Sequence, residues 1–290
     1  GGEIKLYVRE KIEEAKATED KLKTSYMAQT KQKKKKSEKP KENKFTAEAE
    51  QSSPSSKFKK KVKLFRGLNK ASPVGEIKEA AEIVISETKR KKKPILAEML
   101  EDYLSCMYNQ KRVDDKKLRI LDAVKTAEIE LRLKIDRDLV WKLNRILSKR
   151  RKFKLNKKKT FSLKESRLVH PMSRTIEEFL NPSQKSRLTA EANFKLEEVP
   201  TRNKLNLQGK MTYTWKNNYR WRLGRKKLVP GYGYIEDCLF KKLADKKIAK
   251  PYKAYSDWNY YLEDSISLNG MGVDYSKYWY WKEFSFCTYI

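Results

Sequence analysis

Cations and aromatic residues alternate in one short stretch of the sequence, residues 213–227. The stretch contains Tyr213, Trp215, Lys216, Tyr219, Arg220, Trp221, Arg222, Arg225, Lys226 and Lys227. Lysine and arginine bind phosphate through charge, and arginine adds a planar, bidentate fork. Aromatic rings offer faces on which unpaired bases or arginine side chains stack. A buried aromatic core with snorkelling cations explains the same pattern, so we expect a mixed surface on which the cations, rather than any one Trp, bind RNA.

Lysine runs outside this stretch are candidates for the same chemistry. Between residues 31 and 63 the sequence has 13 Lys against four Glu, and such a segment buries too little apolar surface to fold alone. We expect an arm that RNA holds in place, and a solubilising tail is the alternative. A basic knob at 145–159 is the other candidate. The predicted RNA-binding residues are Lys33, Lys34, Lys35, Lys36, Lys59, Lys60, Lys61, Arg150, Arg151, Lys210, Arg220, Arg222, Arg225, Lys226 and Lys227.

The sequence shows no set of residues or motif that is typical of a catalytic site. It has a single His, His170, so most acid–base and triad arrangements are unavailable. We find no phosphate-binding glycine loop, no HExxH and no GxSxG. The three cysteines, Cys106, Cys238 and Cys287, form no CxxC pair, and a reducing compartment is the default for such a chain. We therefore expect no enzymatic activity, no cofactor and no metal site.

Charge dominates the composition. The 69 Lys and Arg residues against 38 Asp and Glu leave a net charge of +31, and only 38% of the residues are hydrophobic, fewer than in an ordinary globular domain. A chain with this charge repels itself and needs a polyanion, for which nucleic acid is the first candidate. No apolar run approaches the ~20 residues that span a bilayer, and the first residues resemble no secretory signal. We therefore expect no membrane partner.

Helices are expected to position the central cations, over residues 71–152. One begins at Pro73 and a second at Pro94, because proline suits the first turn of a helix. A third segment, 114–133, is less regular, because the apolar residues at its end alternate like those of a strand. A fourth helix begins near Asp136 and ends in the basic knob.

The amino-acid composition changes in the second half of the sequence. Residues 160–200 contain several prolines, and we expect a loop-rich segment with short helices at 175–180 and 186–198. After residue 200 the sequence holds five of the six Trp and many Tyr, a β-rich pattern. The predicted organisation is a lysine-rich extended or disordered arm (1–70), a helical extension (71–160), an irregular linker (161–199) and an α+β domain (200–290). The predicted fold class is thus α+β: a two-layer C-terminal module, with helices on a mixed or antiparallel sheet, preceded by a mostly helical extension and a lysine-rich tail.

Residues 204–211, Lys-Leu-Asn-Leu-Gln-Gly-Lys-Met, are similar to a strand-plus-turn motif of the universal small-subunit ribosomal protein three family. In this resemblance Gly209 forms the turn and Lys210 replaces an arginine. Gly224-Arg225 and the following 228–230 resemble the family's Gly-Arg-Val-Pro-Leu turn. Residues 263–273 resemble its last helix, turn and strand, so we expect a helix over 256–268 and a strand from Val273 that includes 277–280.

The resemblance covers 200–290, about a third of the chain. The family's KH domain has a GxxG loop that clamps nucleic-acid backbone, and residues 1–200 contain none. The resemblance implies a structural constituent of an organellar small ribosomal subunit, bound to rRNA of the head near the side where mRNA enters, in the mitochondrial matrix. Its implied partners are rRNA, neighbouring small-subunit ribosomal proteins, mRNA and a separate chain that supplies the KH half.

Two alternatives come from other classes. The first is an organellar RNA-binding processing or assembly factor outside the ribosome. The second is a structural subunit of a membrane-bound complex whose lysine tail lies on acidic lipid.

Overall fold

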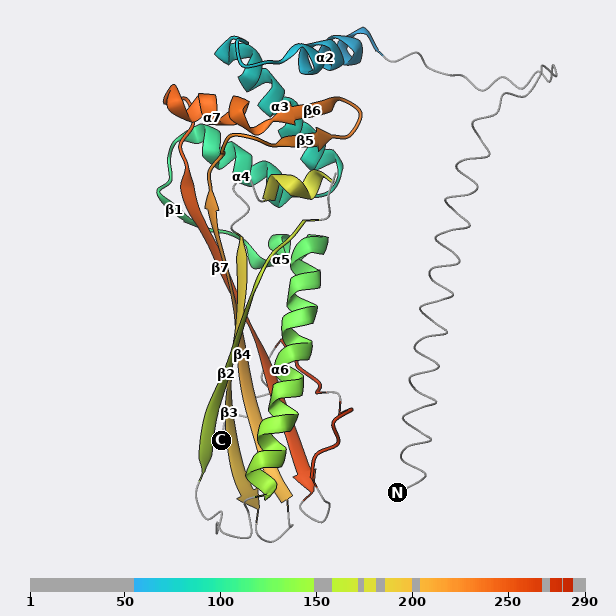
Figure 1. The fold of residues 1–290 in the computed structure, drawn as a ribbon, viewed down its shortest axis with the longest axis vertical. Coiled ribbons are helices and arrows are strands. Elements are labelled where there is room, and N and C mark those ends of the chain that lie inside the picture. Colours follow the sequence, from blue (N-terminus) through green and yellow to red (C-terminus); the bar gives the residue numbers. More distant parts are fainter. Residues whose placement is uncertain are drawn as a thin grey trace, which may run out of the picture. The chain divides into compact units, whose positions relative to one another are not determined.

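The computed structural model describes residues 55–148, 158–171, 175–180, 186–199, 204–267, 272–277 and 279–283. All of them belong to the larger of two compact units, Pro54–Ile290. The predicted α+β class is confirmed: a mixed five-stranded sheet carries a long helix on one face, and shorter helices surround a two-stranded sheet (Figure 1).

The described helices are α2 (Ser56–Gly67), α3 (Val74–Arg90), α4 (Pro94–Ser105), α5 (Asp115–Leu118), α6 (Asp122–Ser148) and α7 (Asp237–Asp245), with a 3-10 turn η2 (Ile176–Leu180). The strands are β1 (Gln110–Arg112), β2 (Lys159–Leu168), β3 (Arg187–Val199), β4 (Lys204–Tyr219), β5 (Lys226–Val229), β6 (Gly233–Glu236) and β7 (Tyr252–Ser267). The large sheet has the order β1-β7-β4-β3-β2, and β5 and β6 form a separate antiparallel pair. Within the large sheet β1 is parallel to β7, and the other neighbours are antiparallel.

The helices at Pro73 and Pro94 begin as predicted. Pro73 is the N-cap of α3, and Pro94 is the first residue of α4. The expected third segment holds the short helix α5 and the first part of α6, and α6 runs on without a break for 27 residues through the start of the expected fourth helix. The strand-like alternation that suggested a break arises because Leu131 and Ile135 face the core, while Ile129 and Leu133 are each 58% exposed.

The start of α6 is fixed by a residue far away in the sequence. The Glu177 carboxylate, on η2, accepts hydrogen bonds from the backbone N–H groups of Asp122 and Ala123, at 2.9 and 3.0 Å. The N–H groups at a helix N-terminus have no acceptor within the helix, and this buried carboxylate serves as the acceptor for two of them. Lys93 Nζ lies 2.9 Å from the same carboxylate and balances its charge.

The irregular linker predicted for 161–199 is wrong, because β2 and β3 lie within it. Residues 186–198, expected as a helix, form β3, and its Leu188, Ala190, Ala192, Phe194 and Leu196 are all buried. This spacing of two is that of a strand with one face in the core. Helix α6 packs on β2 and β3, so the helical region and the sheet share one core without a boundary at residue 200.

Four further expectations about local structure are also wrong. Gly209 makes no turn: it lies within the 16-residue strand β4, where a Cβ atom would be 3.0 Å from the Phe194 ring. The expected helix at 256–268 is the second half of β7. Residues 279–281 are not in a strand, and the single bridge there joins Tyr261 to Lys282. Residues 56–67, assigned to the extended arm, form α2.

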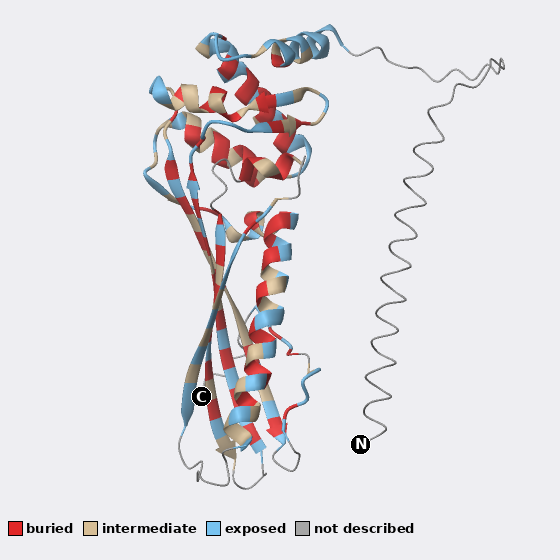
Figure 2. Cartoon of the chain, viewed as in Figure 1, coloured by how far each residue is buried: buried red, intermediate tan, exposed pale blue. Residues whose placement is uncertain are grey.

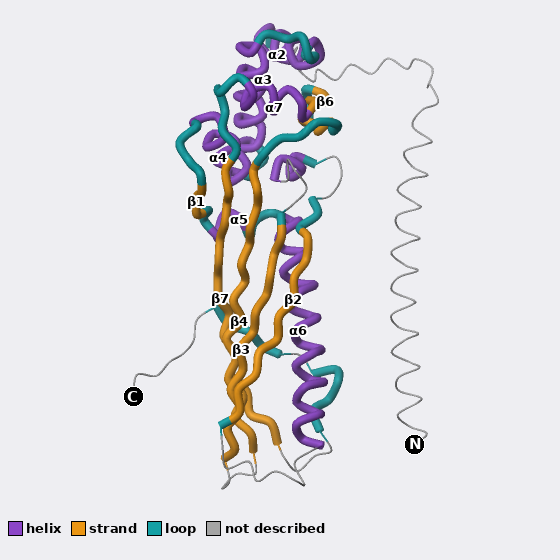
Figure 3. The backbone as a smooth tube through the Cα atoms, turned by 60° about the vertical axis from the view of Figure 1, so that its left-hand side comes forward, coloured by secondary structure: helices purple, strands orange, loops and turns teal. Residues whose placement is uncertain are grey.

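The two faces of the large sheet differ in their side chains. Buried and exposed residues alternate along β3, β4 and β7 (Figure 2), and the buried set lies on the side of the sheet that packs against α6. The opposite side, which we call the open face, is covered by no described element, and Figure 3 shows the strands lying on one side of α6. Helices α3, α4 and α7 pack together beyond one end of this sheet, and α2 packs on α3 and β6.

Candidate nucleic-acid interface

Helix α2 carries a continuous set of exposed cations. It contains five Lys, one Arg and no acidic residue. The Ser55 side chain caps its first turn and accepts a 3.3 Å hydrogen bond from the Phe58 N–H. On the opposite side, Phe58 and Phe65 contact the Tyr232 ring, with centroids 5.4 and 5.9 Å apart. The exposed Lys59, Lys60 and Lys61 are therefore held on a helix that is anchored to the β5–β6 pair.

The loop from β4 to β5 places four of the predicted cations at the surface. Arg220, Arg222, Arg225 and Lys226 are exposed. Gly224 allows the loop to turn, with a φ of +100° that other residues rarely adopt. Lys226 Nζ lies 3.2 Å from the Glu236 carboxylate. No acidic residue that the structure describes forms an ion pair with the three arginines, so they remain available to an external anion.

Lys227 is the exception among the predicted cations, because it is buried. Only 3% of its side chain is exposed, and its Nζ lies 3.4 Å from the Asp237 carboxylate. Burial raises the pKa of Asp237 to about 6 and lowers that of Lys227, although each charge favours the ionised form of the other. Lys227 belongs to the core and is not a phosphate ligand. In β5 it shares the inward side with Val229, a spacing of two that is visible in the sequence.

The aromatic residues of 213–227 also belong to the core. Trp215 is fully buried and its Nε1 donates a 2.5 Å hydrogen bond to Ser186 Oγ. Tyr213 stacks on Trp258, with ring centroids 5.6 Å apart, and Trp221 stacks on Phe240 at 4.2 Å. These rings are not available to bases. The mixed surface expected for this stretch is thus divided by side: aromatic residues face the core and the cations other than Lys227 face solvent.

Lys210 is exposed on the open face of β4. Its Nζ lies 5.9 Å from the centroid of the Tyr261 ring on β7, within the range of a cation–π contact. The sequence reasoning missed the neighbours of Lys210 on this face, including Lys204, Tyr255 and Tyr261. Their signal is the unbroken alternation of β4, which the turn expected at Gly209 would have interrupted.

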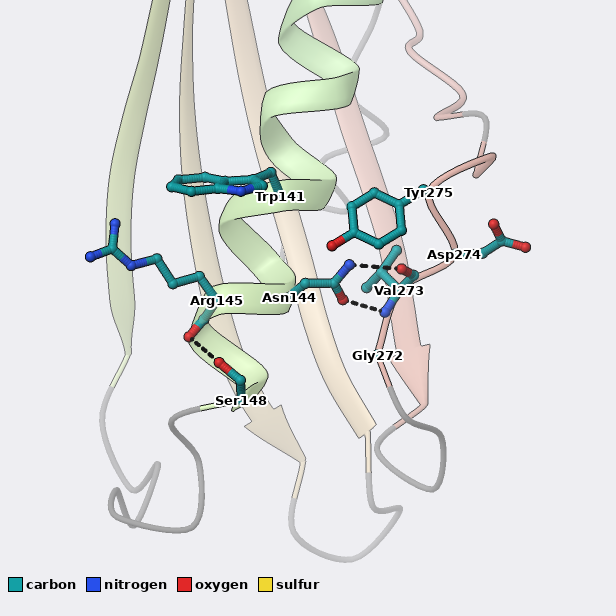
Figure 4. Close-up of a pocket in the computed structure, with 8 residues that line it drawn as sticks. All are labelled: Trp141, Asn144, Arg145, Ser148, Gly272, Val273, Asp274 and Tyr275. Atoms are coloured by element: carbon teal, nitrogen blue, oxygen red, sulfur yellow. Dashed lines mark hydrogen bonds between the residues drawn. The ribbon is translucent and has the colours of Figure 1, made fainter. Parts of the chain in front are cut away.

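A hollow lies at the far end of α6, near the predicted basic knob. It is lined by Trp141, Asn144, Arg145, Ser148 and residues 272–275 (Figure 4). The Asn144 amide donates to the Val273 carbonyl at 2.9 Å and accepts from its N–H at 2.7 Å, so it holds this segment against the helix. Arg145 lies 5.5 Å from the exposed Trp141 ring. The hollow offers one arginine and two aromatic rings, and residues 149–157 of the knob, including Arg150 and Arg151, lie outside the described residues.

Lys33, Lys34, Lys35 and Lys36 also lie outside the described residues. Within the described part of the chain, no three His, Cys, Asp or Glu side chains are grouped as metal ligands would be. The described helices include none with the length and apolar character of a membrane span.

The comparisons with protein-family models, curated proteins and solved structures give no match to this chain.

Proposed function

We propose that this protein is a non-enzymatic, structural RNA-binding protein. The observation that supports this proposal best is α2, which presents six cations and no acid to solvent while its aromatic residues fix it to the fold. An amphipathic helix that served only to cover the core would carry charges of both signs. The arginine loop at 220–225 adds three cations without acidic neighbours in ion-pair distance.

The mechanism of binding is counterion release. Each phosphate neutralised by Lys or Arg frees condensed cations, so affinity falls steeply with salt. Arginine can also hold one phosphate through two parallel hydrogen bonds. Neither contact distinguishes one base from another. We therefore expect the protein to recognise the shape of the RNA backbone rather than a base sequence.

A charge-matched pair of variants tests this proposal. Arg220→Gln, Arg222→Gln and Arg225→Gln together remove three cations without ion-pair partners. Lys89→Gln, Lys134→Gln and Lys241→Gln remove three cations that already pair with Glu101, Glu165 and Asp245. Both triple variants lower the net charge equally, so any difference between them reports position and not total charge.

We expect the arginine variant to weaken binding of the full chain to structured RNA and to reduce the slope of log affinity against log salt by about 2. The lysine variant should lower that slope by less than 1. Fluorescence anisotropy between about 50 and 200 mM salt measures both slopes. Equal slopes for the two variants would show that the arginine loop is not the interface.

Within this class, we propose a structural constituent of an organellar small ribosomal subunit, located in mitochondria and bound to rRNA of the head. Support comes from the charge, from the strand over 204–211 and from the turn at Gly224, which agree with the ribosomal protein three resemblance. The continuous strand through Gly209 and the strand in place of the 256–268 helix depart from it. Neighbouring ribosomal proteins, mRNA and a separate KH chain are the further partners that this proposal implies.

Sedimentation of mitochondrial ribosomes tests the ribosomal proposal. A ribosomal constituent should remain with the small subunit through a high-salt wash and crosslink to rRNA. Release into the wash, with crosslinks to other RNAs, would favour the processing or assembly factor. Flotation with acidic liposomes after nuclease treatment would favour the membrane-complex subunit instead.

A further inference from the structure

The open face of β4 carries a row of side chains suited to an extended nucleic-acid strand. The row is Lys204, Asn206, Gln208, Lys210, Thr212, Thr214, Lys216 and Asn218. It contains three lysines, five neutral hydrogen-bonding side chains and no acid. Because β4 lies between β7 and β3 in the sheet, this row runs along the middle of the face. Successive lysines are six residues apart, which is about 20 Å in a strand.

Two tyrosines on β7 lie beside this row. Tyr255 is in register with Lys216, and Tyr261 with Lys210, so both rings are on the open face. Each is half-buried, and Lys210 contacts the Tyr261 ring. A tyrosine with a cation on the adjacent strand offers a base a flat surface and its phosphate a charge. Two such pairs recur about 20 Å apart.

Acidic residues on the open face do not cancel these lysines. Asp257 pairs with Arg112 at 3.3 Å, Glu191 with Lys164 at 3.0 Å, and Glu197 with Lys195 at 3.5 Å. Each of these three acids is thus matched by a cation outside the β4 row. Glu263, in register with Gln208 of the row, is the remaining acid, and Arg187 and Lys253 add cations on the same face. The face is positive, with the excess along β4.

The surface between the strands is hollowed where the row passes. One groove, between β3 and β4, is lined by Thr189, Glu191, Asn193, Thr212 and Thr214, together with Lys164, Arg187 and Lys216. The lining of a second includes Asn193, Lys195, Gln208, Lys210, Tyr261 and Glu263. They share Asn193, which is in register with Lys210, so the two grooves adjoin beside the row.

We propose that the open face binds single-stranded RNA lengthwise along β4, with phosphates on Lys204, Lys210 and Lys216 and unpaired bases on Tyr255 and Tyr261. This inference rests on the proposed RNA-binding function and names a second surface and its ligand. A single strand is required because paired bases cannot expose their faces to the tyrosines. Many antiparallel sheets have one polar face exposed to solvent. Such a face does not need a central strand without acidic residues, and it does not need aromatic rings beside that strand.

Two variants of the full chain test this inference. The first combines Tyr255→Ala with Tyr261→Ala, and the second combines Lys210→Gln with Lys216→Gln. The control combines Ile129→Ala with Leu133→Ala, which shortens two apolar side chains on α6 that are each 58% exposed and lie away from the open face. The lysine variant changes only exposed side chains, so it remains informative if the tyrosine variant folds poorly.

Binding is measured by anisotropy with a short labelled oligouridine and with a duplex RNA. We expect the tyrosine variant to bind oligouridine at least about tenfold more weakly, with little change for the duplex. The lysine variant should lose affinity and reduce the salt slope by about 1. The control should bind as the unmodified chain does.

The outcomes separate this inference from the proposed function. If the unmodified chain binds RNA and both open-face variants keep their oligouridine affinity, the open face is not a binding surface, while the proposed function stands. Equal losses for duplex and oligouridine would overturn the single-strand assignment. If the unmodified chain binds neither RNA, both proposals fail.

Discussion

The Nε1 of Trp281 donates a 2.8 Å hydrogen bond to Oδ1 of Asp136, deep between α6 and the C-terminal segment. Burial raises the pKa of Asp136 to about 6, against the opposing influence of this hydrogen bond and of Arg132. The folded chain therefore binds more protons at this site than the unfolded chain between about pH 4 and pH 6. The contribution of Asp136 to stability rises as the pH falls through this window.

Asp136→Asn should remove that contribution, because an amide stays neutral and its oxygen still accepts from Trp281. We expect the variant to be about 1–3 kcal/mol more stable than the unmodified chain near neutral pH. The difference should vanish near pH 4. Urea unfolding across this range measures it, with Asp138→Asn on the same helix as the control for lost charge. A less stable Asn variant at neutral pH would contradict the prediction.

The buried pair of Lys227 and Asp237 should respond unequally to loss of either partner. Asp237→Asn leaves a buried ammonium without a counter-charge, and we expect a loss of roughly 3 kcal/mol. Lys227→Met should cost less, about 1 kcal/mol, because the pKa of Asp237 is already about 6 and the carboxyl can protonate. Thermal or urea unfolding of both variants and of the double variant checks the order. A larger loss for Lys227→Met would refute this account.

The capping role of Glu177 predicts a graded series. Glu177→Ala removes the acceptor for two N–H groups of α6 and the partner of Lys93, and we expect a loss of about 2–3 kcal/mol. Glu177→Gln keeps one acceptor oxygen, so its free energy of unfolding should lie between those of the unmodified chain and the Ala variant. Hydrogen exchange of the first turn of α6 provides a local readout. If the Gln and Ala variants are equally stable, the cap is not what Glu177 contributes.

Two glycines with opposite surroundings give a matched pair of predictions. Gly209→Ala should destabilise the fold by about 1–3 kcal/mol, because its Cβ would meet the Phe194 ring at 3.0 Å and the Trp281 ring at 3.2 Å. Gly75→Ala, in the first turn of α3, meets no atom within 4 Å. It should stabilise the fold by roughly 0.5 kcal/mol. Unfolding curves of the two variants should thus shift in opposite directions.

Local signals made part of the fold predictable. The starts of α3 and α4 follow from Pro73 and Pro94, whose fixed φ suits a first helical turn. Strand β3 was mistaken for a helix because its Leu, Ala and Glu residues favour helices, and the pairing with β2 and β4 that overrides this preference is non-local. The helix expected over 256–268, where the structure has the second half of β7, came from the resemblance. The alternation of Tyr252, Ala254, Ser256 and Trp258 indicates a strand instead.

The candidate interface was predictable to a similar extent. Charge and exposure coincide at Lys59–Lys61 and at the loop arginines, where the chain lies at the surface. Lys226 and Lys227 look alike in the sequence, yet one is exposed and the other buried, because strand side chains alternate. The open face could not be recognised without the β4–β7 register, which brings Tyr261 beside Lys210.

Strand β2 is the last strand of the large sheet, and no described strand pairs with its outer side. Such an edge presents free N–H and C=O groups, on which a second chain can add a strand and start aggregation. Lys159, Lys164 and Arg167 lie along this edge, and charged side chains, lysine above all, oppose such pairing. Part of the positive charge thus has a protective use: it opposes the pairing of this edge with a strand of a second chain.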